Sequence, residues 1–248
     1  MNYASFVVLS TQRSGSTLLR TALDSHPEIS CRGELFLPSY SQGDSFRDFV
    51  SEKKLSRISE LLHRRRLVYS YLDRLYDDTL AGARGFKIMY GQMGYRPYKF
   101  PMVFDYIRDY GVRVIHLVRE NTLDICISRQ FARASKTYHA VEQYQPRSQT
   151  VNIPTLILEM RKVEREKIRW RSAVKGLRCL DQTYEDFVNS RSESSRRILE
   201  FLGVESAIEL VSPLKRLSGA HLNERVLNYE EMVQEVVSHG YGRFLAGP

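Results

Sequence analysis

The chain has 248 residues, with 37 lysines and arginines against 29 aspartates and glutamates, and a formal net charge of +8. This length suits one large α/β domain with a buried core, so residues 1–248 are expected to form a single domain. The sequence has no run of about 20 apolar residues, so no transmembrane helix is expected. It also lacks the basic and apolar regions of a signal peptide, which predicts a cytoplasmic location.

The positive charge favours anionic ligands, but it is spread along the chain. The densest cluster, Arg64–Arg66, is expected to be the solvated face of a helix. A nucleic-acid patch is the alternative; no nucleic-acid motif accompanies the cluster, so no nucleic-acid partner is expected. The three cysteines, Cys31, Cys126 and Cys179, are too few and too widely spaced for a disulfide framework or a zinc site.

Short apolar runs separated by longer polar segments predict a parallel sheet. Four runs are expected to be its core strands: Phe6–Ser10, Gly85–Met89, Val112–Val118 and Leu177–Gln182. Each is separated from the next by enough chain for a helical crossover. The fold class is therefore α/β, with a central parallel sheet flanked by helices in three layers.

Helices are predicted between these strands and after the last one. Their ranges are Thr17–Ser25, Pro101–Tyr110, Thr122–Ala134, Pro154–Val174, Ser194–Leu202 and Asn223–Val237. The polar, interrupted segment Phe46–Leu80 is expected to hold two helices. The segment Ser135–Ile153 has few aliphatic residues and is interpreted as a surface loop over a site, with a disordered connector as the alternative.

Residues 10–17, between the first strand and the first helix, read Ser-Thr-Gln-Arg-Ser-Gly-Ser-Thr. Such a turn holds phosphate through backbone N–H groups and the positive end of the helix dipole. Against the P-loop pattern G-x-x-x-x-G-K-[ST], it keeps Gly15 and Thr17 but has Ser10 for the first glycine and Ser16 for the lysine. Because that lysine reaches the β- and γ-phosphates of nucleoside triphosphates, the turn favours another phosphate-bearing ligand.

A second anion site is predicted where the third strand ends. Arg119 follows that strand, and Ser128 lies two to three turns along the next helix. Open α/β sheets bind ligands at the carboxyl ends of their strands, where the turn at residues 10–17 also lies. Two anion sites at one sheet edge suit a ligand with two separated phosphates.

These motifs resemble those of the sulfotransferases that use 3′-phosphoadenosine-5′-phosphosulfate (PAPS). The run Gln12-Arg13-Ser14-Gly15-Ser16-Thr17 resembles their 5′-phosphosulfate loop, and Arg119 with Ser128 resembles their 3′-phosphate pair. Tyr184-Glu185-Asp186 resembles the segment whose tyrosine lies near the adenine. The nine-residue interval between Arg119 and Ser128 looks more like the bacterial carbohydrate branch, which includes the trehalose and Nod-factor enzymes.

The resemblance implies PAPS as the donor, adenosine 3′,5′-bisphosphate (PAP) as a product, and no metal. Arg13 would cradle the phosphosulfate, and Thr17 with the loop amides would hold the 5′-phosphate. Lys215 lies in the C-terminal segment, where the family brings basic groups over the 3′-phosphate. His116, in the middle of an apolar strand, is interpreted as a core histidine.

Sulfuryl transfer needs a base for the acceptor proton and positive charge near the oxygen that leaves with the phosphate. The candidate base is Glu34, with Glu28 as its rival. The candidate electrophile is Lys87, since a lysine in an apolar strand needs an anionic partner. Arg13 is the alternative for this role, and a structural salt bridge is the alternative reading of Lys87.

The predicted function is therefore sulfuryl transfer to a hydroxyl of a carbohydrate, glycolipid or other acceptor. Two other functions stay open from the sequence. One is a small-molecule kinase with a degenerate P-loop, and the other is a non-catalytic nucleotide-binding protein of the same fold. The sequence does not predict an oligomeric state.

Overall fold

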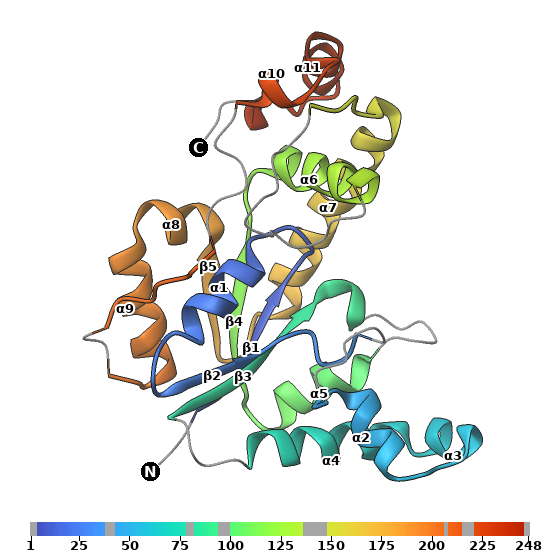
Figure 1. Ribbon diagram of the computed structural model, residues 1–248, viewed down its shortest axis with the longest axis vertical. Helices are drawn as coiled ribbons and strands as arrows, with labels where there is room; N and C mark the ends of the chain where they lie inside the picture. Colours follow the sequence, from blue (N-terminus) through green and yellow to red (C-terminus); the bar gives the residue numbers. More distant parts are fainter. Residues whose placement is uncertain are drawn as a thin grey trace.

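The computed structural model describes residues 4–37, 43–77, 82–93, 100–135, 148–205, 208–214 and 221–245. Within these ranges, five parallel strands form one sheet in the order β2-β3-β1-β4-β5 (Figure 1). The strands are β1 (Ala4–Ser10), β2 (Ile29–Arg32), β3 (Ala83–Met89), β4 (Arg113–Val118) and β5 (Cys179–Thr183). The predicted α/β fold with a central parallel sheet flanked by helices is confirmed.

The four predicted strands correspond to β1, β3, β4 and β5, but the prediction missed β2. This strand has only four residues, Ile-Ser-Cys-Arg, and it pairs on one side only, with β3. Its inner residues Ile29 and Cys31 are buried, whereas Arg32 is exposed. So short an alternating run at a sheet edge gives no continuous apolar signal.

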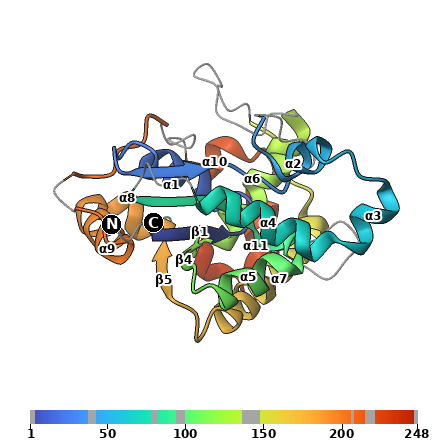
Figure 2. The same cartoon turned by 90° about the horizontal axis from the view of Figure 1, so that it is seen from below.

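Helices cover both faces of the sheet, which gives three layers (Figure 2). One face packs against α1 (Ser16–Leu23), α8 (Tyr184–Asn189) and α9 (Arg191–Leu202). The other packs against α4 (Arg64–Tyr76), α5 (Pro101–Asp109) and the C-terminal end of α7 (Ile153–Ala173). Alternate residues of β1 serve the two layers: Phe6 and Val8 face the first, and Val7 and Leu9 face the second.

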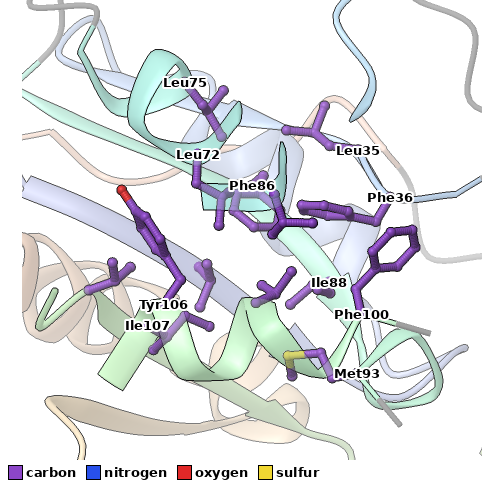
Figure 3. Close-up of a cluster of buried hydrophobic side chains, with 14 of the residues drawn as sticks. Leu35, Phe36, Leu72, Leu75, Phe86, Ile88, Met93, Phe100, Tyr106 and Ile107 are labelled. Atoms are coloured by element: carbon purple, nitrogen blue, oxygen red, sulfur yellow. The ribbon is translucent and has the colours of Figure 1, made fainter. Parts of the chain in front are cut away.

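The second of these layers contains an aromatic cluster that anchors the chain after β2 (Figure 3). Phe36 packs against Phe46, Phe86 and Phe100 with ring centroids 4.9–5.7 Å apart. Leu35 beside it is also fully buried. Such pairs add to the free energy gained by burial alone, so the backbone next to residue 34 is held firmly against the sheet.

Two helical predictions are corrected by the structure. The described part of the segment Phe46–Leu80 contains three helices, α2 (Phe46–Glu52), α3 (Arg57–Leu62) and α4, rather than two. The segment Asn223–Val237 contains α10 (Leu222–Arg225) and α11 (Tyr229–Ser238), because an isolated bridge between Gln149 and Val226 interrupts the helix. Short 3-10 turns at Tyr90–Gln92 and Gly242–Phe244 complete the described elements.

Helix α6 (Thr122–Ser135) packs with α7 and α11 in a third core cluster. Most of the predicted loop Ser135–Ile153, residues 136–147, lies outside the described residues. In the described part of the chain, no helix has both the length and the hydropathy to cross a bilayer.

His116 of β4 is completely buried, and both of its ring nitrogens have hydrogen-bond partners. Nε2 lies 2.6 Å from the hydroxyl of Tyr90, and Nδ1 lies 2.8 Å from Oδ1 of Asp181. Burial lowers the pKa of His116 from its ordinary value of 6.5 and outweighs the attraction of Asp181. The folded protein therefore holds a neutral imidazole in its core.

This burial predicts a loss of stability on acidification. Below pH about 6.5 the unfolded chain binds a proton at His116 more readily than the folded chain does. The free energy of unfolding should therefore fall as the pH drops through this value, and His116→Gln should reduce that fall. Urea unfolding at pH 7.5 and 5.5 measures both proteins. The same fall in both would contradict the prediction.

Candidate functional site

The turn between β1 and α1 has two residues in the left-handed backbone region. Arg13 has φ +66° and Gly15 has φ +85°, and Gly15 precedes the first helical residue, Ser16. No side chain caps α1 at Gly15, and the first-turn N–H groups of any helix lack intrahelical acceptors. This turn therefore presents backbone donors to an anion at the positive end of α1.

A close approach by Tyr184 explains why residue 15 is glycine. A Cβ atom on Gly15 would lie 2.2 Å from Cδ2 of Tyr184, so no larger residue fits beside this ring. The guanidinium carbon of Arg119 lies 4.7 Å from the centroid of the same ring. The structure thus brings the Tyr184 ring, the turn and Arg119 together, as the sequence motifs required.

The two predicted anion sites meet directly. Nε of Arg13 donates a 2.8 Å hydrogen bond to Oγ of Ser128 on α6. Arg119 points its Nη1 at the carbonyl oxygen of Arg13, at 3.5 Å, and its Nη2 lies 2.6 Å from Oδ2 of Asp124. Nε of Arg119 is buried and has no hydrogen-bond partner within the described residues, so this side chain keeps a donor for a ligand.

Lys87 and Glu34 form the other half of the site. Nζ of Lys87 donates to Oγ1 of Thr17 at 3.1 Å and lies 3.2 Å from Oε1 of Glu34. The Lys87 side chain is 6% exposed and that of Glu34 is 19% exposed. The anionic partner that a buried lysine requires is therefore the predicted base, and Lys87 joins this carboxylate to Thr17 at the start of α1.

Glu28, the rival base, lies at the opposite edge of the sheet. It precedes β2, and its carbonyl oxygen accepts a hydrogen bond from the first residue of β3, Ala83. Glu34 follows β2, at the carboxyl ends of the parallel strands, where Lys87 and Thr17 also lie. Strand β2, which the sequence analysis did not predict, thus separates the carboxylates of Glu28 and Glu34.

The remaining predicted residues of the turn differ in exposure. Ser14 and Ser16 are buried, Gln12 is exposed, and Oγ of Ser14 has no hydrogen-bond partner within the described ranges. Lys215 lies outside the described residues.

Sequence reasoning missed Arg129, which follows Ser128 on α6. Its Nη2 donates to Oγ1 of Thr11 at 2.6 Å and to the carbonyl oxygen of Gln12 at 3.2 Å. Burial lowers the pKa of this guanidinium from its very high ordinary value. Its position next to Ser128 was the one feature of the sequence that pointed to the site. Because an arginine in a helix ordinarily faces water, the residue type alone did not indicate a contact with the turn.

We expect Arg129 to hold the turn in its binding conformation. Arg129→Gln should weaken PAP binding by about tenfold, because a charge-assisted hydrogen bond to the turn is lost. Titration calorimetry measures the change. Arg133→Gln, on the same helix but in an exposed pair with Glu159, is the matched control. If the two variants bind PAP equally well, Arg129 does not position the turn.

Comparisons with known proteins bear on the family and the fold of the chain. The family model described as "Sulfotransferase family" matches residues 5–207. A search of curated protein sequences found no significant match. Among solved structures, the sulfotransferase domain from the curacin biosynthetic pathway has a TM-score of 0.51 at 15% identity, over 97% of this chain and 98% of that one.

A sulfotransferase from Alicyclobacillus acidocaldarius has a TM-score of 0.50 at 13% identity, over 100% of this chain and 98% of its own. A mouse sulfotransferase complexed with PAP has a TM-score of 0.48 at 13% identity, over 100% of this chain and 68% of its own. At such low identities the matches to the curacin-pathway domain and to the Alicyclobacillus enzyme show the fold alone. The family model, however, covers most of the sequence, and by it the chain belongs to the sulfotransferase family.

Proposed function

We propose that this chain transfers a sulfuryl group from PAPS to a hydroxyl of its acceptor, with Glu34 as the base. One observation carries the proposal: Lys87 contacts both Glu34 and Thr17, so the candidate base is joined to the anion-binding turn. Membership of the sulfotransferase family supports the reaction class.

The donor is assigned from the two adjoining anion sites. The turn and Thr17 bind the 5′-phosphosulfate, and Arg119 with Ser128 binds the 3′-phosphate. Tyr184, which packs on Gly15, is assigned to the adenine from the family resemblance of Tyr184-Glu185-Asp186. Ser14 Oγ and Arg119 Nε, which have no hydrogen-bond partner within the described residues, supply donors that fit such a ligand.

Lys87 also explains the absence of a lysine from the turn. Residue 16 is serine, yet Nζ of Lys87 reaches Thr17, the next residue, from the neighbouring strand. The positive charge at the start of α1 is thus supplied by β3 rather than by the turn itself. This placement favours a single phosphosulfate over the triphosphate of a kinase substrate.

In the proposed reaction, Glu34 accepts the proton of the acceptor hydroxyl, whose oxygen attacks sulfur. The bond between sulfur and the phosphate oxygen breaks, giving a sulfate ester and PAP. The ion pair couples the two events, because a protonated Glu34 no longer neutralises Lys87. The Lys87 ammonium and Arg13 then stabilise the charge that develops on the leaving oxygen.

The acceptor class is proposed as a carbohydrate or glycolipid. Its support is the nine-residue interval between Arg119 and Ser128, which resembles that of the bacterial carbohydrate branch.

Transfer of radiolabelled sulfate from PAPS to a panel of oligosaccharides, glycolipids, phenols and peptides tests this function. Labelled sugar or glycolipid products are expected. PAP binding without transfer to any acceptor would favour the non-catalytic alternative, and phosphate transfer from magnesium-ATP would favour the kinase.

Glu34→Gln should lower kcat by about a hundredfold to ten-thousandfold, because the glutamine amide cannot accept the proton. PAP affinity should change much less, because in the described part of the chain Glu34 is linked to the proposed phosphate sites through Lys87 and not by a direct contact. Glu28→Gln is the control and should retain full activity, since Glu28 lies at the opposite sheet edge. Steady-state kinetics with the best acceptor measures both variants. Full activity of Glu34→Gln would show that another group is the base.

Arg119→Ala should weaken PAP binding by about tenfold or more, the contribution of one charge-assisted hydrogen bond. Calorimetric titration measures the loss. Arg108→Ala, an exposed arginine of α5 paired with Asp105 and Asp109, is the control and should bind PAP normally. Unchanged affinity of Arg119→Ala would refute the 3′-phosphate assignment.

A further inference from the structure

Helix α3 contributes nothing to the core of the protein. It has no buried residue, and it projects at the margin of the molecule in both overall views (Figures 1 and 2). A six-residue helix gains little stability from its own hydrogen bonds, and most helices in proteins depend on packing. The side chains of α3 therefore add little to the packing of the core.

Four large aliphatic side chains gather on this segment and face solvent. Leu55, Ile58, Leu61 and Leu62 are 39%, 73%, 61% and 77% exposed. Ile58, Leu61 and Leu62 have the i, i+3, i+4 spacing of one helix face. Exposed apolar residues are ordinary when scattered, but a cluster of this kind marks an interaction surface.

The same segment is strongly basic. Between residues 53 and 66 there are six lysines and arginines and one acidic residue, Glu60. We call residues 53–66 the α3 tip. Lys54, Arg57 and Arg66 are exposed and form no ion pair within the described residues, so their charges face outward. The cluster Arg64–Arg66, which the proposed sulfuryl transfer does not use, ends the α3 tip.

Charge and hydrophobicity together select one kind of occupant. A second copy of the chain would bring two basic tips together, which like-charge repulsion opposes. The phosphates of a nucleic acid would pair with the arginines, but they would not bury the exposed leucines. A membrane with anionic lipids can bind both kinds of side chain. The basic residues contact the lipid head groups, and the aliphatic side chains enter the boundary with the acyl chains.

We propose that the α3 tip is a peripheral docking site for an anionic lipid surface. Ile58, Leu61 and Leu62 enter the interface, and Lys54, Arg57 and Arg66 contact the lipid phosphates. No helix that could span a bilayer is found in the described residues, and this docking needs none. The proposal is independent of the sulfuryl-transfer chemistry, so it is tested by binding alone.

Flotation of the full chain with vesicles tests the proposal. One set contains phosphatidylcholine and phosphatidylglycerol in equal amounts, and the other contains phosphatidylcholine alone. The protein should float with the first set only, and less at high salt. Ile58→Ser/Leu62→Ser should lower the partition coefficient by about tenfold or more, because two inserted aliphatic side chains are lost. Lys54→Gln/Arg57→Gln should also lower it.

The matched control is Leu158→Ser/Ile168→Ser on α7, whose side chains are 65% and 69% exposed but lie outside the α3 tip. It should float like the unmodified protein, and an unchanged circular dichroism spectrum and thermal midpoint verify that each variant is folded. The proposal is overturned if the unmodified protein does not float, or if Ile58→Ser/Leu62→Ser floats equally well. Self-association or RNA binding through the tip, without flotation, would overturn it as well.

Discussion

The ammonium group of Lys87 is a positive charge inside a strand whose neighbours are apolar, and its stability there depends on Glu34 Oε1 at 3.2 Å and Thr17 Oγ1 at 3.1 Å. Removing one partner of a buried ion pair typically costs about 3–5 kcal/mol, because the other charge is left without compensation. The two contacts of Lys87 therefore join three segments: β3, the chain after β2, and the start of α1. The proposed catalytic groups are at the same time structural partners.

The parallel sheet explains why distant motifs converge. Every strand ends at the same edge, so Arg119 after β4 and the turn after β1 become neighbours although more than a hundred residues separate them. The hydrogen bond from Arg13 to Ser128 then joins this turn to α6. Buried Leu35 and Phe36 fix the chain beside Glu34. The site is held by packing on both sides of the sheet rather than by one loop.

Patterns that span several residues were readable from the sequence, whereas contacts between segments were not. The runs that form β1 and β3 are buried on both faces and were visible as apolar stretches. β2 was missed because an edge strand of four residues alternates apolar and polar positions. Arg129 was missed because nothing local distinguishes an arginine that crosses to Thr11 from one that faces water. Glu34 was preferred to Glu28 from the sequence, but the finding that they lie at opposite ends of β2 needed the structure.

In the proposed site, one sheet edge holds a nucleotide with separate 5′- and 3′-phosphates. Calorimetric titration of the unmodified protein with PAP, adenosine 5′-monophosphate and magnesium-ATP measures whether the 3′-phosphate contributes to binding. Arg119 and Ser128 add two contacts to the 3′-phosphate, so PAP should bind about a hundredfold more tightly than adenosine 5′-monophosphate. Equal affinity for these two nucleotides, or tighter binding of magnesium-ATP than of PAP, would contradict the account.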